Sequence, residues 1–148
     1  MIKAVLDTNI LMDALQERSP FDTDAKEIFK LAQNGKELIC LFTANAAADI
    51  FYLYSKARGM KSARIALDFL LSNYEVVSVT HEDCKAALLL PIEDFEDALL
   101  VTCAQSVNAN FIVTRNYEFL QAALPDKTIS PQDFLGCFFT NGNSDVDA

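Results

Sequence analysis

The sequence predicts an α/β domain in which helices cover both faces of a parallel sheet. Short runs of aliphatic and β-branched residues recur along the 148-residue chain, and amphipathic helical patterns separate them. Polar residues directly follow the first and fourth of these runs. In such folds, ligands bind beyond the carboxyl ends of the strands. A hydrophobic content of 51%, with four Gly and four Pro, is typical of one compact domain with a sizeable core.

In the first half of the chain, two strands alternate with four helices. The apolar runs IKAVL at 2–6 and ELICLF at 37–42 predict buried strands because both are short and each is followed by a polar residue. Gly35 and Gly59 end two amphipathic patterns, as glycine commonly does after the last helical turn. The helices predicted here span residues 10–16, from Asp22 or Thr23 to 34, 44–58 and 62–71.

The second half continues the alternation. The predicted strands are EVVSV at 75–79, NFIVT at 110–114 and KTIS at 127–130. THEDCKAALLL begins with a Thr-x-x-Asp pattern typical of a capping box, and Pro91 opens the next helix. The helices predicted here span residues 80–90, 91–107 and 131–139, and the loop RNYEFL at 115–120 leads into a further short helix. Residues 140–148 have Val146 as their only apolar anchor, so we expect a single domain over 1–139 and a disordered tail.

Composition restricts the compartment and the partners. Twenty-one acids against twelve Lys and Arg give a net charge of -9, so the overall field opposes nucleic acid and acidic membranes. No segment approaches the ~20 apolar residues of a membrane helix, and no apolar stretch resembles a signal peptide. The four cysteines form no CxxC pair and there is one histidine, which excludes a structural zinc site. We therefore expect a cytoplasmic protein with reduced thiols.

Two aspartates stand where a carboxylate is unusual. Asp7 directly follows the first predicted strand, where capping of the next helix is the structural alternative to a role in catalysis. Asp49 lies in ANAAADIFYLY, which is apolar on nearly all sides, and no Lys or Arg lies three or four positions away. Because an unpaired buried carboxylate is costly, Asp49 either lies on a narrow solvent stripe or needs a cation.

A third acidic feature is EDFED at 93–97, with four acids in five positions. The helix dipole favours acids at this end of a helix and accounts for part of the cluster. Asp94 and Asp97 are three positions apart and share a face, and Asp97 precedes the apolar run ALLVTCA. Clustered carboxylates are unfavourable unless a cation lies between them. Oxygen ligands without Cys or His favour Mg²⁺ or Mn²⁺, ions that typically serve phosphate-ester chemistry.

Five segments together resemble the PIN-domain family of metal-dependent ribonucleases. They are VLDTNILMDAL, TANAAADIFYL, DFEDALLVTCA, IVTRN and ISPQDFL, in this order over residues 2 to about 135. The resemblance implies a three-layer α/β/α sandwich around a mainly parallel sheet of about five strands, with acids that bind Mg²⁺ or Mn²⁺. Many small members are VapC-type toxins that cut RNA. By position, Asp7 and Asp97 match the first and third acids, and Asn9 matches the polar residue two places after the first.

Two positions depart from the family pattern. The second acid is commonly Glu, and Asp49 takes its place with a shorter side chain. The fourth acidic position falls on Asn116, with Glu118 two residues further on as a substitute. Because Asn adds no charge, we expect weaker metal binding than in a four-acid site. The expected catalytic residues are Asp7, Asp49 and Asp97, and the expected outer metal ligands are Asp94, Asn116 and Glu118.

The remaining candidates concern substrate. No acid occurs between Asp49 and Asp68, while two Lys and two Arg do, so this segment carries +4. It is either a solvated helix surface or a docking place for an RNA backbone or an acidic partner. Thr114 and Arg115 either make contacts within their own loop or bind substrate, since a guanidinium suits phosphate. The expected substrate-binding residues are Asn9, Thr114, Arg115, Lys56, Arg58, Lys61 and Arg64.

The function that these features favour is a metal-dependent endoribonuclease that uses a metal-activated water, as the toxin of a toxin–antitoxin pair. The alternative is a PIN-like binding or regulatory module without catalysis, because Asn116 replaces an acid and the net charge is negative. The resemblance also implies an antitoxin partner and a homodimer. A phosphate-accepting receiver domain is disfavoured, since no acid directly follows the strand EVVSV.

Overall fold

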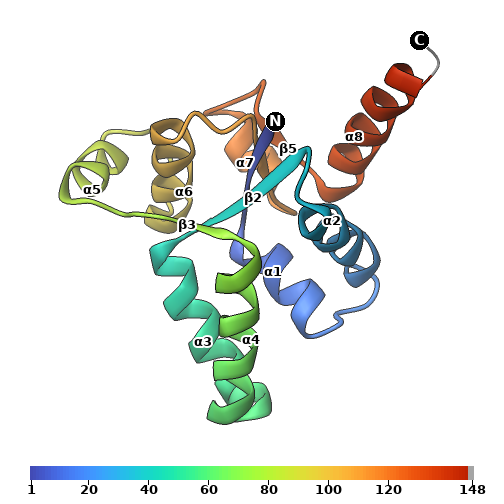
Figure 1. The fold of residues 1–148 in the computed structure, drawn as a ribbon. Coiled ribbons are helices and arrows are strands. Elements are labelled where there is room, and N and C mark those ends of the chain that lie inside the picture. Colours follow the sequence, from blue (N-terminus) through green and yellow to red (C-terminus); the bar gives the residue numbers. More distant parts are fainter. Residues whose placement is uncertain (147–148) are drawn as a thin grey trace.

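The structure, a computed structural model, describes residues 1–146 (Figure 1). Its centre is a five-stranded sheet of order β3-β2-β1-β4-β5, in which every neighbouring pair is parallel. This confirms the parallel sheet of about five strands. The strands span Ile2–Leu6 (β1), Leu38–Thr43 (β2), Glu75–Val77 (β3), Phe111–Val113 (β4) and Thr128–Ile129 (β5).

Helices cover both faces of the sheet, so the three-layer α/β/α sandwich is confirmed (Figure 1). Ala4 and Leu6 of β1 pack into one core with α1, α2 and α8, whereas Val5 packs into a second core with α6. This alternation is the two-residue period of a strand. The helices span Thr8–Leu15 (α1), Asp22–Asn34 (α2), Ala44–Arg58 (α3), Met60–Asn73 (α4), His81–Leu88 (α5), Phe95–Ser106 (α6), Tyr117–Gln121 (α7) and Pro131–Val146 (α8).

Two helix boundaries differ from the prediction by four residues or more. α6 begins at Phe95 rather than at 91, because Asp94 caps its first turn by accepting a 3.1 Å hydrogen bond from the Asp97 backbone N–H. α8 continues to Val146, beyond the predicted helix end at 139. Its first turns are anchored by buried Phe134 and Leu135, and extending an existing helix adds one hydrogen bond per residue. Residues 147–148 of the predicted tail lie outside the described residues.

The cysteines and the helix lengths bear on the expected compartment. All four cysteines are free thiols. Burial raises the pKa of Cys40 to about 12 and that of Cys103 to about 11, which leaves both thiols protonated and unreactive at neutral pH. Within residues 1–146, no helix combines the length and the apolar character needed to cross a membrane.

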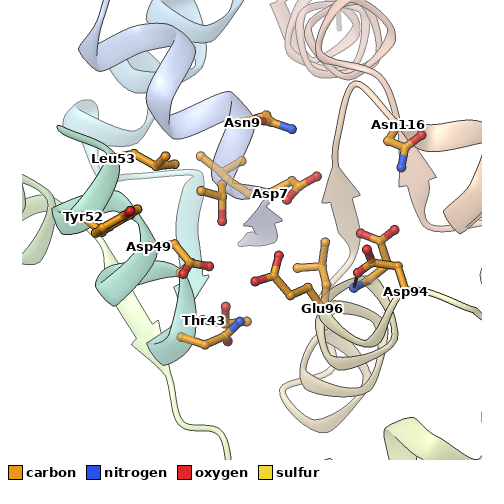
Figure 2. Close-up of a pocket in the computed structure, with 15 residues that line it drawn as sticks. Asp7, Asn9, Thr43, Asp49, Tyr52, Leu53, Asp94, Glu96 and Asn116 are labelled. Atoms are coloured by element: carbon orange, nitrogen blue, oxygen red, sulfur yellow. Dashed lines mark hydrogen bonds between the residues drawn. The ribbon is translucent and has the colours of Figure 1, made fainter. Parts of the chain in front are cut away.

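The carboxyl ends of β1, β2 and β4 meet at one edge of the sheet. Leu6 pairs with Val113, and the Asp7 N–H donates to the Val113 carbonyl at 3.0 Å, so the ladder continues one residue beyond β1. In this strand order the chain changes direction at β1, which is where open parallel sheets form a crevice. Figure 2 looks into this crevice, between α3 and α6. From the same edge, α3 and α4 leave the sheet as a hairpin (Figure 1).

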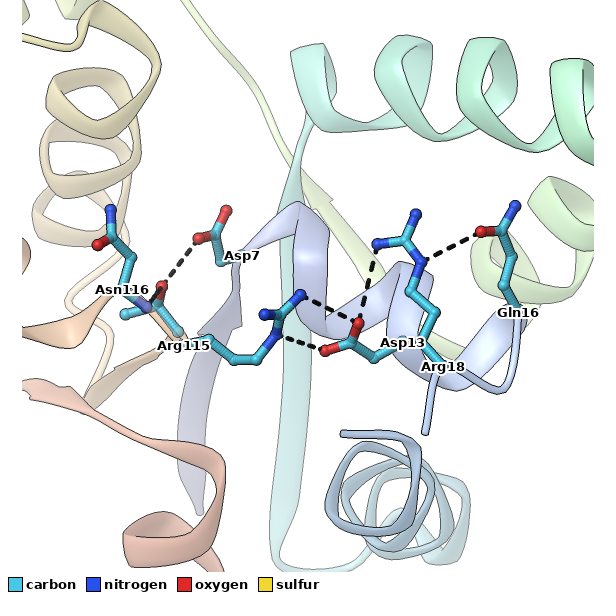
Figure 3. A network of polar contacts seen from close by, with 7 residues as sticks. Asp7, Asp13, Gln16, Arg18, Arg115 and Asn116 are labelled. Atoms are coloured by element: carbon cyan, nitrogen blue, oxygen red, sulfur yellow. Dashed lines mark hydrogen bonds and ion pairs between the residues drawn. The ribbon is translucent and has the colours of Figure 1, made fainter. Parts of the chain in front are cut away.

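A buried ion pair joins α1 to the loop that follows β4 (Figure 3). Asp13 is 0% exposed, and Arg115 donates to both of its oxygens, from Nε at 2.7 Å and from Nη2 at 3.2 Å. Arg18 lies 3.8 Å from the same carboxylate, and the Arg115 guanidinium lies 4.1 Å from the ring centroid of Phe21. These contacts fix the backbone beside Thr114, whose hydroxyl donates a hydrogen bond to Asp7.

We expect Arg115→Met to destabilise the fold by about 3 kcal/mol, because it leaves the buried Asp13 carboxylate with only the more distant Arg18. Urea unfolding measures the change. Lys30→Met is the matched control, since it removes an exposed pair with Glu27 and should have little effect. Equal losses in the two variants would contradict a structural role for the Asp13–Arg115 pair.

Candidate functional site

Acids from three segments line one pocket at the carboxyl edge of the sheet (Figure 2). The pocket has a volume of about 470 Å³. Asp7 enters it from the end of β1, Asp49 from α3, and Asp97 from the first turn of α6. Asp94 and Glu96 complete the acidic wall, and none of the lining residues is Lys or Arg. The structure thus brings together the three acids that the sequence selects as the catalytic core.

Asp7 is held by a hydrogen bond from the loop after β4 rather than by helix capping. It occupies the N-cap position of α1, but its side chain makes no capping hydrogen bond. Instead, Asp7 Oδ2 accepts a 2.8 Å bond from Thr114 Oγ1, which in turn accepts one from the Asn116 backbone N–H at 3.0 Å (Figure 3). Burial raises the pKa of the Asp7 carboxyl, and the Thr114 hydrogen bond counteracts part of this rise.

Asp49 and Glu96 face each other across the pocket. Asp49 lies in the second turn of α3 and is half-buried, so it is neither on an open solvent stripe nor paired with a cation. Burial and the neighbouring charge of Asp49 raise the pKa of Glu96, and the two carboxyl groups hydrogen-bond when one is protonated. Removing that proton leaves two facing negative charges.

Asp97 and Asp94 are coupled through the start of α6. Burial, then the charges of Asp94 and Asp7, raise the pKa of the Asp97 carboxyl. Asp94 Oδ1 accepts the capping hydrogen bond from the Asp97 N–H, so only its second oxygen remains available to a ligand. Asp94 is therefore a helix cap as well as part of the pocket wall.

The donor set fits a hydrated divalent cation. Among the described residues, no three Asp, Glu, His or Cys side chains lie close enough to hold a metal ion by themselves. Mg²⁺, however, keeps several waters and is commonly bound by one or two carboxylates, and acids that raise one another's pKa are relieved by a cation. Asn45 Oδ1 also lies buried in this pocket without a hydrogen-bond partner, an acceptor that a water molecule would satisfy.

The predicted outer ligands divide between the pocket and the surface. Asp94 and Asn116 line the pocket, as does Asn9, which the sequence predicts to bind substrate rather than metal. Glu118 does not line it and lies exposed on α7, so the substitute for a fourth acid is not found in the pocket. The family's fourth acidic position is therefore represented here by the Asn116 amide alone.

Thr114 and Arg115 both make contacts within the protein, which is the structural alternative to substrate binding. Thr114 is fully buried and holds Asp7, and Arg115 is committed to Asp13. Contact of these two side chains with substrate stays a prediction. The four basic residues predicted to bind substrate are exposed on the α3–α4 hairpin, outside the pocket lining; they are Lys56, Arg58, Lys61 and Arg64.

Several pocket residues escaped the sequence prediction. Glu96 was not among the predicted site residues. Asp94 and Asp97 were predicted to share a helical face, but Asp94 precedes the helix, so the spacing of residues on a helical face does not apply to it. The Asp-x-x-Asp capping pattern in DFED was the available signal. Nothing in the sequence distinguished the other pocket residues from core-facing or surface residues; they are Thr43, Asn45, Tyr52 and Leu53.

Comparison with known proteins identifies the family. A sequence profile of the PIN domain matches residues 3–118. No curated protein sequence gives a significant match.

Solved structures of VapC and VapBC proteins share the fold. VapBC2 from Rickettsia felis, solved bound to a promoter DNA fragment, has a TM-score of 0.65 at 19% identity, covering 87% of this chain and 98% of that one. VapC20 from Mycobacterium tuberculosis, a toxin that cleaves the sarcin–ricin loop, has a TM-score of 0.66 at 15% identity, covering 80% and 94%. VapBC-1 from Haemophilus influenzae has a TM-score of 0.65 at 16% identity, covering 88% and 99%. With its parallel sheet, its acidic pocket and a profile match over residues 3–118, this chain belongs to the PIN-domain family.

Proposed function

We propose that the protein is a metal-dependent endoribonuclease and the toxin of a toxin–antitoxin pair. The observation that carries the proposal is the convergence of Asp7, Asp49 and Asp97 on one pocket at the carboxyl edge of the sheet. Membership of the PIN-domain family and the likeness of the fold to VapC structures support a nuclease of the same kind. The pocket chemistry favours Mg²⁺ or Mn²⁺, because every polar group in it offers oxygen or amide and none offers sulfur or imidazole.

The residues of this chain would divide the work as follows. A bound ion lowers the pKa of water and neutralises charge on a phosphodiester, so no protein nucleophile is needed. Asp7, Asp49 and Asp97 would hold the ion. Thr114 fixes the rotamer of Asp7 by its 2.8 Å hydrogen bond, and the Asn116 amide at the rim can orient water or substrate without adding charge.

Charge restricts how RNA would reach the pocket. With a net charge of -9 and an acidic pocket, the protein repels polyanions except near the α3–α4 hairpin, where Lys56, Arg58, Lys61 and Arg64 are exposed. RNA would therefore be held by this basic hairpin and by the ion. Binding of this kind weakens steeply as the salt concentration rises.

The proposal extends to protein partners. The structure from Klebsiella pneumoniae that resembles this fold is a toxin–antitoxin complex, with a TM-score of 0.65 at 21% identity. An antitoxin protein and a second copy of this chain are the partners that a VapC-type toxin would have. The acidic surface outside the hairpin suits a basic partner.

A catalytically inactive PIN-like binding module is the second candidate. Asn116 stands where the family has a fourth acid, and the described residues contain no ready cluster of three ligands. Calorimetric titration with Mn²⁺ separates the candidates. A nuclease should bind the ion at or below millimolar concentration, whereas an inactive module should show no heat of binding.

We expect Asp7→Asn to abolish Mn²⁺-dependent RNA cleavage and growth arrest while leaving the fold intact, because the amide still accepts the Thr114 hydrogen bond but adds no charge. Cleavage of a labelled RNA and a thermal melt measure the two effects. Asp68→Asn removes an exposed acid outside the pocket and should cleave like the wild type. Wild-type rates in Asp7→Asn would remove Asp7 from the proposed machinery.

We expect Asp97→Asn to raise the melting temperature of the metal-free protein at pH 7 by a few degrees. The folded pKa of Asp97 lies above its ordinary value of 3.8, so its contribution to stability is fully present below that value and is lost as pH rises through the folded pKa. The variant should therefore melt like the wild type near pH 3. Thermal melts in EDTA measure this, and saturating Mn²⁺ should reverse the order by stabilising only the wild type. A variant that melts below the wild type in EDTA at pH 7 would contradict the account.

A further inference from the structure

An exposed aromatic residue forms part of the pocket wall. Tyr52 and Leu53 line the same pocket as Asp49 and are 56% and 39% exposed. They lie three and four positions after Asp49 on α3, so the three side chains share one face of the helix. Figure 2 shows Tyr52 and Leu53 on the α3 side of the pocket, opposite Asp94 and Glu96.

A cation follows the aromatic residue one turn further along the helix. Lys56 Nζ lies 4.7 Å from the centroid of the Tyr52 ring, a cation–π contact that restrains the ring. From Asp49 to Lys56, the face of α3 therefore runs from acid through aromatic to cation over about 10 Å. Arg58 and Lys61 continue the positive charge to the tip of the hairpin. The pocket thus has an acidic interior, an aromatic edge and a basic exterior.

This order of groups matches the parts of an unpaired nucleotide chain. A base has a neutral π-face that stacks on an exposed aromatic ring whatever its sequence, and the phosphates that follow need cations. A double-stranded RNA keeps its bases stacked inside the helix, where an aromatic residue on the rim of a pocket does not reach them. An aromatic ring between the acids and the cations therefore favours a single strand or a loop.

We infer that Tyr52 stacks on an unpaired base next to the phosphate held at the acids, and that Lys56 binds a neighbouring backbone phosphate. Tyr52 would then be a substrate-positioning residue, with little preference for the base that stacks on it. This inference rests on the proposed ribonuclease function and adds Tyr52 to that site as a residue that positions the RNA.

Cleavage of short RNAs by four proteins tests the inference: the wild type, Tyr52→Phe, Tyr52→Leu and Met60→Ala. The substrates are an unstructured oligonucleotide and the same strand in a duplex, both with Mn²⁺. Met60 is the control, because it is 63% exposed on the same hairpin but does not line the pocket. Thermal melts establish that each variant folds.

If the Tyr52 ring stacks on a base, the variants should differ in their cleavage rates in a specific order. Tyr52→Leu should lose roughly tenfold in kcat/KM for the single strand, mostly through KM, because the stacked base contributes to binding before and during the reaction. Tyr52→Phe keeps the ring and should stay within about twofold of the wild type, as should Met60→Ala. The wild type should cut the duplex far more slowly than the single strand.

A fluorescent base gives a second, direct readout. In an Asp7→Asn background that leaves the RNA uncut, 2-aminopurine is placed at successive positions of the oligonucleotide. Stacking on Tyr52 should quench its fluorescence at one position, and Tyr52→Leu should abolish that quenching while Tyr52→Phe keeps it. Lys56→Gln should weaken binding and reduce its salt dependence without removing the quenching.

The possible failures are distinguishable. If the wild type cuts no RNA, the proposed function fails and this inference fails with it. If the wild type cuts RNA and Tyr52→Leu cuts it equally well, only the stacking inference is overturned. Equal losses in Tyr52→Phe and Tyr52→Leu would assign the effect to the hydroxyl and would also overturn it, as would wild-type cleavage of the duplex at the single-strand rate.

Discussion

The parallel pairing of β1 with β4 is the constraint on which the rest of the site depends. Leu6 lies opposite Val113, so the chain leaves both strands at the same level, and Asp7 and Thr114 come within hydrogen-bond distance although 107 residues separate them. The Asp13–Arg115 pair fixes the same loop from its other side. Two long-range contacts of different chemistry thus determine where the first acid points, and the acids of α3 and α6 are arranged around it.

The pocket concentrates charge of one sign that the fold alone does not neutralise. Burial and mutual repulsion raise the pKa values of Asp7, Glu96 and Asp97, so the ionised pocket opposes folding unless something positive enters it. Arg115 is paired with Asp13, and two cations of the hairpin, Lys56 and Arg64, lie over the rings of Tyr52 and Phe51 rather than beside these acids. The repulsion between these carboxylates lowers the stability of the fold and gives the pocket a negative potential.

Features that depend on neighbouring residues could be predicted from the sequence, whereas features that depend on contacts between distant residues could not. The strands, the fold class and the acids Asp7, Asp49 and Asp97 were readable because apolar runs and misplaced carboxylates are local features. Glu96 was missed because its role depends on α6 starting at Phe95, and that start depends on the Asp94 cap. Thr114 and Arg115 remained ambiguous because their partners, Asp7 and Asp13, lie more than one hundred residues away. The helix end at Val146 was not predicted, because residues 140–146 carry a single apolar residue and no amphipathic pattern.

Asp94 both caps α6 and lines the pocket, so binding in the pocket is coupled to the first turn of this helix. One oxygen of this carboxylate accepts a hydrogen bond from the Asp97 N–H in the first turn of α6, and the same side chain belongs to the pocket wall. A ligand that draws Asp94 inward competes with the helix for that carboxylate, and the released amide of Asp97 becomes open to exchange with solvent. Hydrogen exchange of the Asp97 amide should therefore report whether a ligand occupies the pocket.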